Sequence, residues 1–262
     1  MRKKQKINKK KQSQRAYKGF VSIVKWHKNK FDVMPYISNI YENGDKKEVS
    51  VYRLPLWRDV TITQKQAYFF YFMAETNEFI DLKPFTLDLS KEFRDRYKKL
   101  TYKQLKAVVI KRINGNLDYQ LQSKSKPMML FILENKTTNK RKDITDKETH
   151  IHGIREVFDE ETDAKVRLVL KTSVCNRKKE YNQSEYSNML QTKEEYNNTK
   201  WGAKGWLRYM NKGAYSNNGL YISQPLLEKI REDYEQLYNE YKDKINLLKK
   251  RGIKIKYIKP DT

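Results

Sequence analysis

The chain has 262 residues, of which 56 are Lys or Arg and 32 are Asp or Glu, so its formal net charge is +24. This length suits one catalytic domain with additions or a small second domain, and the positive charge favours a polyanionic partner, above all nucleic acid. The single cysteine, Cys175, excludes an internal disulfide and a thiolate metal site, so a bound metal would need imidazole, carboxylate or amide ligands.

The most basic segment is residues 1–18, which hold nine Lys or Arg and no acid. We expect a disordered basic arm that follows phosphates. The sequence stays polar until Phe20, without the apolar core of a secretory signal or a membrane span, so we expect a cytoplasmic protein that does not bind membranes. Codon bias in an AT-rich genome is a plainer explanation of the charge, which the motifs must outweigh.

Residues 19–80 are expected to form an N-terminal extension, which is a candidate DNA-binding region. The apolar run 20–24 and the alternating residues 48–54 predict short strands, with a turn at 43–45 between them. Thr63 followed by Gln66 fits a capping box and favours a helix over 63–73, although the aromatic run 67–73 is equally compatible with a strand.

Residues 81–223 show the clearest periodicity. Alternating apolar residues predict a strand over 85–89, and the capping box of Thr101 with Gln104 begins a predicted amphipathic helix over 101–114. Three further strands are predicted at 128–133, 151–158 and 166–170. A polar segment without a clear period, 175–199, is expected to be a mobile loop or a frayed helix.

A helix-like apolar stripe follows at 201–214, and residues 224–262 are predicted to form a C-terminal helix, ending near Lys250, and a tail. That helix could pack on the core or on a second copy of the chain. The order of elements predicts an α+β fold, an antiparallel sheet with helices on one face.

Two of the three histidines, His150 and His152, lie in one tripeptide. Residues i and i+2 of a strand point to the same face, so both imidazoles could bind one divalent cation. Glu134 ends the preceding predicted strand, which a hairpin would place beside His150, and its carboxylate completes a set suited to Mg²⁺ or Mn²⁺. Asp88 and Glu148 are alternative third ligands, and two incidental surface histidines are the alternative to any site.

Tyr209 and Lys212 are three residues apart in the helix-like segment and would share one helical face. A phenol ionises only near pH ~10, so a tyrosine nucleophile needs a metal that polarises its target and a nearby cation, here Lys212. The chain has 19 tyrosines, so an ordinary surface pair is the alternative. The next tyrosine, Tyr215, lies beyond Gly213, which indicates a single catalytic tyrosine.

Three ordered motifs resemble those of the HUH endonucleases that initiate rolling-circle replication: Phe-Thr-Leu-Asp-Leu-Ser at 85–90, His-Ile-His-Gly at 150–153 and Tyr-Met-Asn-Lys at 209–212. The resemblance spans residues 84–223. It implies an RRM-like core, a divalent metal on His150 and His152, and Tyr209 as the nucleophile. Glu134 is similar in position to the third ligand of several initiators, whereas the long segment 135–149 departs from their compact hairpin.

The resemblance implies a plasmid or phage replication initiator that nicks and rejoins single-stranded DNA at an origin, leaving a 5′-phosphotyrosine and a free 3′-OH. Expected partners are that DNA, a host helicase or polymerase, and a second copy of the chain. A transposase or relaxase would use the same chemistry. From a different class, the alternative is a non-catalytic protein that binds single-stranded nucleic acid, with Trp201 and Trp206 as candidates for base stacking or for core packing.

Overall fold

The computed structural model describes residues 2–30, 48–74, 82–122, 125–134, 149–175, 186, 188–192, 206, 210 and 219–259. The chain divides into two units, unit 1 with residues 1–73 and 228–262 and unit 2 with residues 74–227. Among the described residues, no helix combines the length and the apolar character that crossing a bilayer requires.

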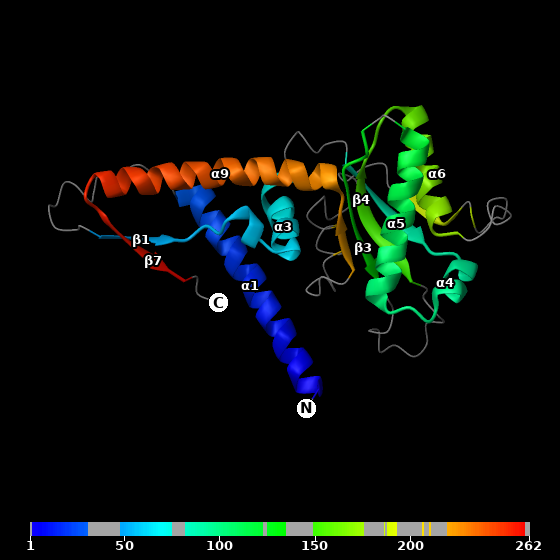
Figure 1. Ribbon diagram of the computed structural model, residues 1–262, viewed down its shortest axis with the longest axis horizontal. Helices are drawn as coiled ribbons and strands as arrows, with labels where there is room; N and C mark the ends of the chain where they lie inside the picture. The colour runs from blue at the N-terminus through cyan, green and yellow to red at the C-terminus, as the bar shows by residue number, and fades with distance from the viewer. Residues whose placement is uncertain are drawn as a thin grey trace. The chain divides into compact units, whose positions relative to one another are not determined.

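Unit 2 is built on a five-stranded antiparallel sheet (Figure 1). Its strands lie in the order β5-β2-β4-β3-β6. Helices α4 and α5 follow β2, and helix α6 follows β4, so the chain runs strand, helix, strand, strand, helix, strand before β6. The predicted α+β class is confirmed. The elements of unit 2 are β2 (Leu82–Asp88), α4 (Lys91–Tyr97), α5 (Tyr102–Leu121), β3 (Met129–Glu134), β4 (His150–Glu156), α6 (Glu160–Ser173), β5 (Leu190–Thr192) and β6 (Leu220–Ile222).

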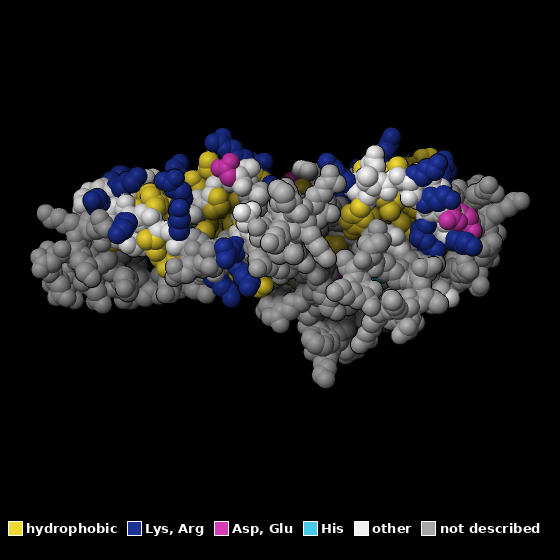
Figure 2. Space-filling view, turned by 90° about the horizontal axis from the view of Figure 1, so that it is seen from below, with side chains coloured by type: hydrophobic (Ala, Val, Ile, Leu, Met, Phe, Trp, Pro, Cys, Tyr) yellow, Lys and Arg dark blue, Asp and Glu magenta, His cyan; other side chains and the backbone are white. Residues whose placement is uncertain are grey.

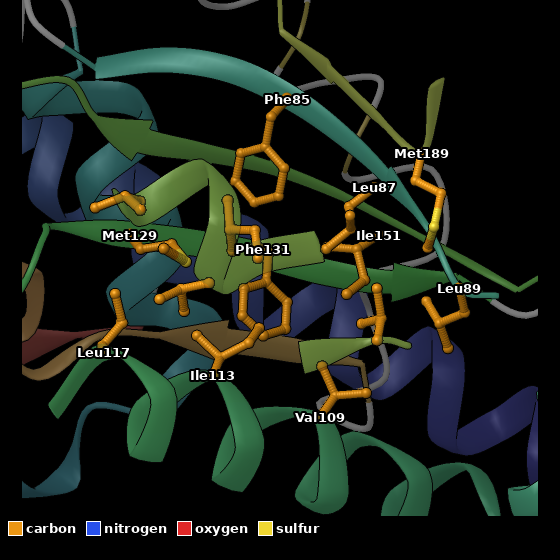
Figure 3. Packing of buried hydrophobic residues seen from close by; sticks show 14 of the residues in the cluster. Phe85, Leu87, Leu89, Val109, Ile113, Leu117, Met129, Phe131, Ile151 and Met189 are labelled. Atoms are coloured by element: carbon orange, nitrogen blue, oxygen red, sulfur yellow. The ribbon is translucent and has the colours of Figure 1, made fainter. Parts of the chain in front are cut away.

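Helices α5 and α6 cover one face of this sheet. That face carries large apolar side chains that pack against α5 and α6 and form the core of unit 2 (Figure 3). Because side chains alternate along a strand, the residues between these core positions face the opposite side. The core side chains of the three central strands are Phe85, Leu87, Met129, Phe131, Leu133 and Ile151.

Helix α5 begins where predicted, with both hydrogen bonds of the Thr101–Gln104 capping box present, but it ends at Leu121 rather than near 114. The predicted stop at Asn114-Gly115 is wrong because the buried stripe continues every fourth residue through Leu117 and Leu121. Burial of these side chains outweighs the cost of one glycine inside a helix, which is about 1 kcal/mol relative to alanine.

The strand predicted at 166–170 is wrong, since these residues lie within α6. The Asp159 carboxylate accepts a hydrogen bond from the backbone N–H of Thr162 at 2.9 Å and caps the helix. Val166, Val169 and Leu170 are buried at helical rather than strand spacing. The apolar run is therefore the buried stripe of a capped helix.

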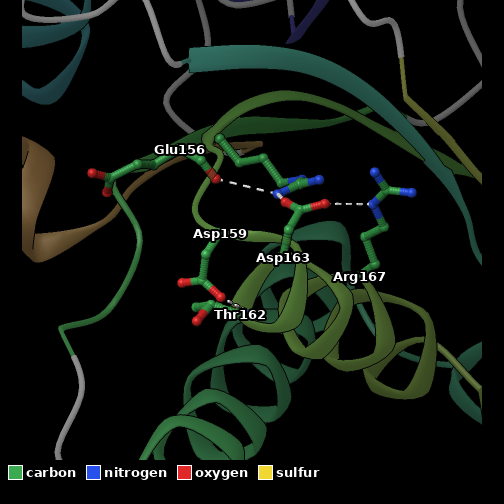
Figure 4. A network of polar contacts seen from close by, with 6 residues as sticks. Glu156, Asp159, Thr162, Asp163 and Arg167 are labelled. Carbon is green, nitrogen blue, oxygen red and sulfur yellow. Dashed lines mark hydrogen bonds and ion pairs between the residues drawn. The ribbon is translucent and has the colours of Figure 1, made fainter.

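A buried ion network joins β4 to α6 (Figure 4). The guanidinium of Arg155, only 1% exposed, donates to the carboxylate of Asp163, which also accepts from Arg167 at 2.6 Å. Burial alone would raise the pKa of Asp163, but the hydrogen bonds and charges of Arg155 and Arg167 lower it. Asp163 is therefore the counter-ion of a fully buried arginine.

Replacing Asp163 with alanine should destabilise the chain by about 3–5 kcal/mol, because it leaves the Arg155 charge buried without its partner. The thermal midpoint should fall by at least about 6 °C. The double change Arg155→Met with Asp163→Leu should recover most of this loss, since it removes both charges. Equal melting of wild type and Asp163→Ala by circular dichroism would contradict the assignment.

Unit 1 is formed by the two ends of the chain. Its elements are α1 (Arg2–Lys30), β1 (Glu48–Tyr52), a 3-10 turn (Trp57–Asp59), α3 (Ile62–Tyr68) continued by a π-helical turn (Phe69–Met73), most of α9 (Gln224–Lys250), and β7 (Lys254–Ile258), which pairs with β1 in parallel. The predicted strand at 48–54 and helices at 63–73 and 224–250 are confirmed in kind. The capping box of α3 is Thr61 with Gln64, two residues before the predicted pair.

The expected disordered arm 1–18 and strand 20–24 are replaced by the single helix α1. Its first half is rich in Lys and Gln, which favour helix, and glycine first occurs at position 19. Tyr17, Phe20, Val24 and His27 are buried at spacings of three and four residues. On α9, Tyr234 stacks with Phe20 and donates its hydroxyl hydrogen bond to the Pro55 carbonyl, so the N-terminal extension and the C-terminal helix share one core.

His27 makes the stability of unit 1 dependent on pH. It is 3% exposed, and its Nε2 lies 2.9 Å from the Tyr52 carbonyl oxygen. Burial is the main cause that lowers the pKa of His27, and the Lys244 charge adds to it. Against the opposing effect of the Tyr52 hydrogen bond, the pKa falls from 6.5 to about 4. On acidification the unfolded chain therefore binds a proton near pH 6.5, whereas the folded chain does not until about pH 4.

The contribution of His27 to the free energy of unfolding is therefore fully present above pH 6.5 and is lost as the pH falls toward 4. Between pH 7 and 4.5, wild type should lose about 2 kcal/mol more unfolding free energy than His27→Gln, because the substituted residue does not titrate. Urea unfolding of both proteins at the two pH values measures this difference. Parallel losses in both would show that His27 is not the titrating group.

Candidate metal centre

The face of the unit 2 sheet opposite the helix-covered core brings together Glu134, His150 and His152. Strands β3 and β4 pair antiparallel with Glu134 directly opposite His150, which confirms the predicted hairpin neighbours. Because His150 and His152 are two residues apart on β4, both imidazoles project from the face opposite Ile151, which is buried in the helix-covered core. Strand alternation and one hairpin register thus position all three side chains.

The three side chains converge closely enough to share one ion. One ligand atom from each lies within 4.8 Å of the others. The Nε2 atoms of the two histidines are 2.8 Å apart, and the Glu134 Oε2 lies 3.5 Å from Nε2 of His150 and 4.0 Å from Nε2 of His152. Two imidazole nitrogens and a carboxylate oxygen form a donor set that fits a divalent metal and leaves further coordination positions open.

Side-chain exposure shows from which side the centre is open. It falls from 33% for Glu134 to 20% for His150 and 7% for His152. The carboxylate side therefore faces solvent, while His152 forms the floor of the centre.

Thr86 fixes the orientation of His152 from the neighbouring strand. It is the direct partner of His152 across β2 and β4, and its Oγ1 lies 3.0 Å from Nδ1 of His152. If Nδ1 carries the proton and donates it to Thr86, Nε2 is left as the free base that a metal ligand requires. The sequence predicts that Thr86 lies in a strand but does not indicate that it orients a metal ligand.

Removing the Thr86 hydroxyl should weaken metal binding without unfolding the sheet. We expect Thr86→Val, which keeps the side-chain shape, to raise the dissociation constant for Mn²⁺ about 10–100-fold. Thr86→Ser keeps the hydroxyl and should bind within a few-fold of wild type. Titration calorimetry without nucleic acid measures both, and equal affinities for the Val and Ser variants would exclude a positioning role.

Trp206 covers His152 from another segment. The two ring centroids lie 5.5 Å apart at an interplanar angle of 86°, and the indole Nε1 donates to the Gly153 carbonyl at 3.1 Å. Gly153 itself has no room for a side chain, since an added Cβ would lie 2.8 Å from the Leu130 carbonyl oxygen and would collide with two carbons of the Phe85 ring. Of the two interpretations of Trp206, packing against the sheet is the one the structure shows.

Tyr102 lies beside the centre at the start of α5. The Tyr102 hydroxyl lies so close to Gly219 that a Cβ added there would collide with the hydroxyl oxygen. That Cβ would also lie 2.6 Å from the Leu133 carbonyl oxygen, so Tyr102 packs closely against the junction of β3 and β6. Burial, together with the negative charge of Glu134, raises the pKa of the Tyr102 phenol. Sequence analysis missed this tyrosine, since only the folding of α5 onto the sheet brings it there.

Of the alternative ligands and the remaining predicted residues, only some lie in the described part of the chain. Asp88 lies opposite His150 on β2 but does not belong to the group of converging ligand atoms. Glu148, Trp201, Tyr209 and Lys212 lie outside the described residues, as do most of the expected loop 175–199 and of the helix-like stripe 201–214. Trp206 and Met210, on either side of Tyr209 in sequence, are described, and Met210 is fully buried.

Comparison with known proteins identifies no relative of this chain: no family model, no curated protein and no solved structure matches it. The converging carboxylate and imidazoles are therefore the main indication of function in this chain.

Proposed function

We propose that this protein is a metal-dependent endonuclease of the HUH type that cleaves single-stranded DNA with Tyr209 and remains attached to the 5′ end. The observation that carries the proposal is the convergence of Glu134, His150 and His152 on the sheet face opposite the helix-covered core. A residue pattern that resembles the family at the sequence level thus gives a plausible ligand set in space. Replication initiation at a plasmid or phage origin is the context that this chemistry suits.

The strand order supports an RRM-like core. The four strands of the strand–helix–strand–strand–helix–strand unit lie as β5-β2-β4-β3, with β6 added beside β3. This is the split β-α-β arrangement, in which the two central strands come from different halves of the unit. In the proposed enzyme β4 is central and bears both histidines, so the metal would sit in the middle of the sheet.

Trp206 connects the predicted nucleophile to the centre. Its ring contacts His152, and Tyr209 follows only three residues later in the sequence. This closeness in sequence supports the proposal that the phenol of Tyr209 acts on a phosphate bound at the metal.

The proposed reaction is a transfer of a phosphoryl group from DNA to tyrosine. The phenol oxygen of Tyr209 forms a bond to phosphorus, the bond between phosphorus and the 3′ oxygen breaks, the phenol proton is lost and the 3′ oxygen gains a proton. A divalent metal bound by Glu134, His150 and His152 would polarise the phosphate and offset its developing charge. Lys212 would stabilise the phenolate character of the nucleophile. Reversal of the same step rejoins strands.

Cleavage by the purified protein tests the proposal. A panel of labelled single-stranded oligonucleotides from the protein's own replicon is incubated with Mn²⁺ or with EDTA and separated on a denaturing gel. The proposal predicts a metal-dependent band of protein joined to the 5′ end of the product and a released fragment with a free 3′-OH. Binding of these oligonucleotides with equal affinity in Mn²⁺ and EDTA and no cleavage would instead favour a non-catalytic binding protein.

A further inference from the structure

The end of unit 1 carries a dense group of cations that the proposed nuclease does not use. From Lys249 to Lys259 the sequence contains no acid. The segment covers the last turn of α9, a tight turn at Gly252 with a positive φ of 76°, and the strand β7 paired with β1. We call β1 and β7, with residues 249–253 and Lys259, the basic ribbon. Its cations in this segment are Lys249, Lys250, Arg251, Lys254, Lys256 and Lys259.

These cations face solvent. All six are exposed, and on the face of Figure 2 Lys and Arg side chains greatly outnumber Asp and Glu over the described residues. Along β7, Lys254 and Lys256 alternate with Ile255 and so share one face, about 6.6 Å apart by strand geometry. On β1 their partners are Glu48 and Ser50, so one acid lies among the lysines.

Ile253 and Tyr257 of the ribbon make contacts within the protein. Ile253 is buried. The Arg53 guanidinium lies over the Tyr257 ring, 4.4 Å from its centroid, and the Tyr257 hydroxyl is hydrogen-bonded to Tyr241 of α9. That ring face is not available for stacking a base, which is the main contact of single-strand binders.

We propose that the basic ribbon binds the phosphate backbone of double-stranded DNA. Lysines on a two-stranded ribbon offer point charges for phosphates without reading bases, and a two-stranded ribbon is of a size that the duplex major groove, about 12 Å wide, admits. This inference goes beyond the nuclease, because it concerns a different unit and needs neither a metal nor Tyr209. Unit 1 would hold the chain on duplex DNA while unit 2 acts on a single strand.

The test is binding of the full chain to a fluorescent duplex of about 20 base pairs, measured by anisotropy in EDTA over a range of salt concentrations. In the ribbon variant, Lys250, Lys256 and Lys259 are changed to Gln. We expect an affinity weaker by at least about tenfold at 0.1 M salt. The slope of log K against log salt should be smaller by about 0.9 to 2.7, since each neutralised phosphate contributes about 0.9. Circular dichroism confirms that the variant is folded.

The matched control removes the same charge from unit 2, with Lys91, Lys98 and Lys99 changed to Gln; all three are exposed. It should keep the duplex affinity within about twofold. Equal losses in both variants would show a general effect of net charge and overturn the inference, as would an unchanged slope in the ribbon variant. A loss confined to single strands or to anionic vesicles would identify a different partner. Because EDTA prevents cleavage, none of these outcomes depends on whether the nuclease proposal holds.

Discussion

Replacing His152 with alanine is expected to abolish metal-dependent cleavage and to weaken Mn²⁺ binding by more than about 100-fold. Loss of a hydrogen bond to a metal ligand already lowers metal affinity about 10–100-fold, and loss of the ligand itself should cost more. His152 is the most buried of the three ligands, and it is fixed from both sides by Thr86 and Trp206. Its removal leaves one imidazole and one carboxylate, which hold a divalent ion weakly. Titration calorimetry and the cleavage assay measure the two effects separately.

The chain provides its own matched control for this prediction. It contains only three histidines, and the third, His27, is buried in unit 1. His27→Gln should therefore leave Mn²⁺ affinity and cleavage unchanged at pH 7. If His152→Ala binds Mn²⁺ as wild type does, the metal site lies elsewhere and the ligand assignment is wrong.

Replacing Tyr209 with phenylalanine should eliminate the covalent adduct completely, since the substituted ring has no oxygen to form the phosphate ester. Binding of Mn²⁺ and of single-stranded DNA should stay within about threefold of wild type, because neither contact needs a reacting hydroxyl; a change of that size is less than 1 kcal/mol. This separation of binding from chemistry distinguishes a nucleophile from a residue needed for folding. The denaturing gel and an anisotropy titration provide both measurements.

Tyr102 is the informative control for Tyr209. It is a tyrosine placed beside Glu134 by the structure, but burial and that carboxylate raise its phenol pKa, which makes it harder to ionise. We expect Tyr102→Phe to retain adduct formation. Loss of the adduct in Tyr102→Phe with retention in Tyr209→Phe would transfer the role of nucleophile to Tyr102.

Much of unit 2 could be predicted because its signals are local. Alternation predicted β2, and apolar segments predicted β3 and β4. A hairpin between the last two was enough to place Glu134 beside His150. The same logic failed at α6, where a short apolar run is compatible with a strand or with one helical face, and the Asp159 cap decides in favour of the helix.

What could not be predicted depends on pairing between distant segments. Thr86 and His152 are 66 residues apart in the chain, and only the register of β2 with β4 brings them together. Unit 1 is the larger case, because α1 packs with α9 and β1 pairs with β7 across almost the whole chain. Periodicity predicts that each helix has an apolar stripe, but not which stripe covers which.

The most direct test of the central claim is to identify the amino acid that carries the DNA. Wild-type protein is allowed to react with a cleavable single strand in Mn²⁺, the DNA is trimmed with nuclease, and the tryptic peptides are analysed by mass spectrometry. Cleavage after Lys and Arg separates Tyr209, in peptide 209–212, from Tyr102, in 100–103, and from Tyr215, in 213–229. The account predicts a nucleotide joined to peptide 209–212 that is absent in EDTA. A nucleotide on another peptide, or none after proven cleavage, would contradict it.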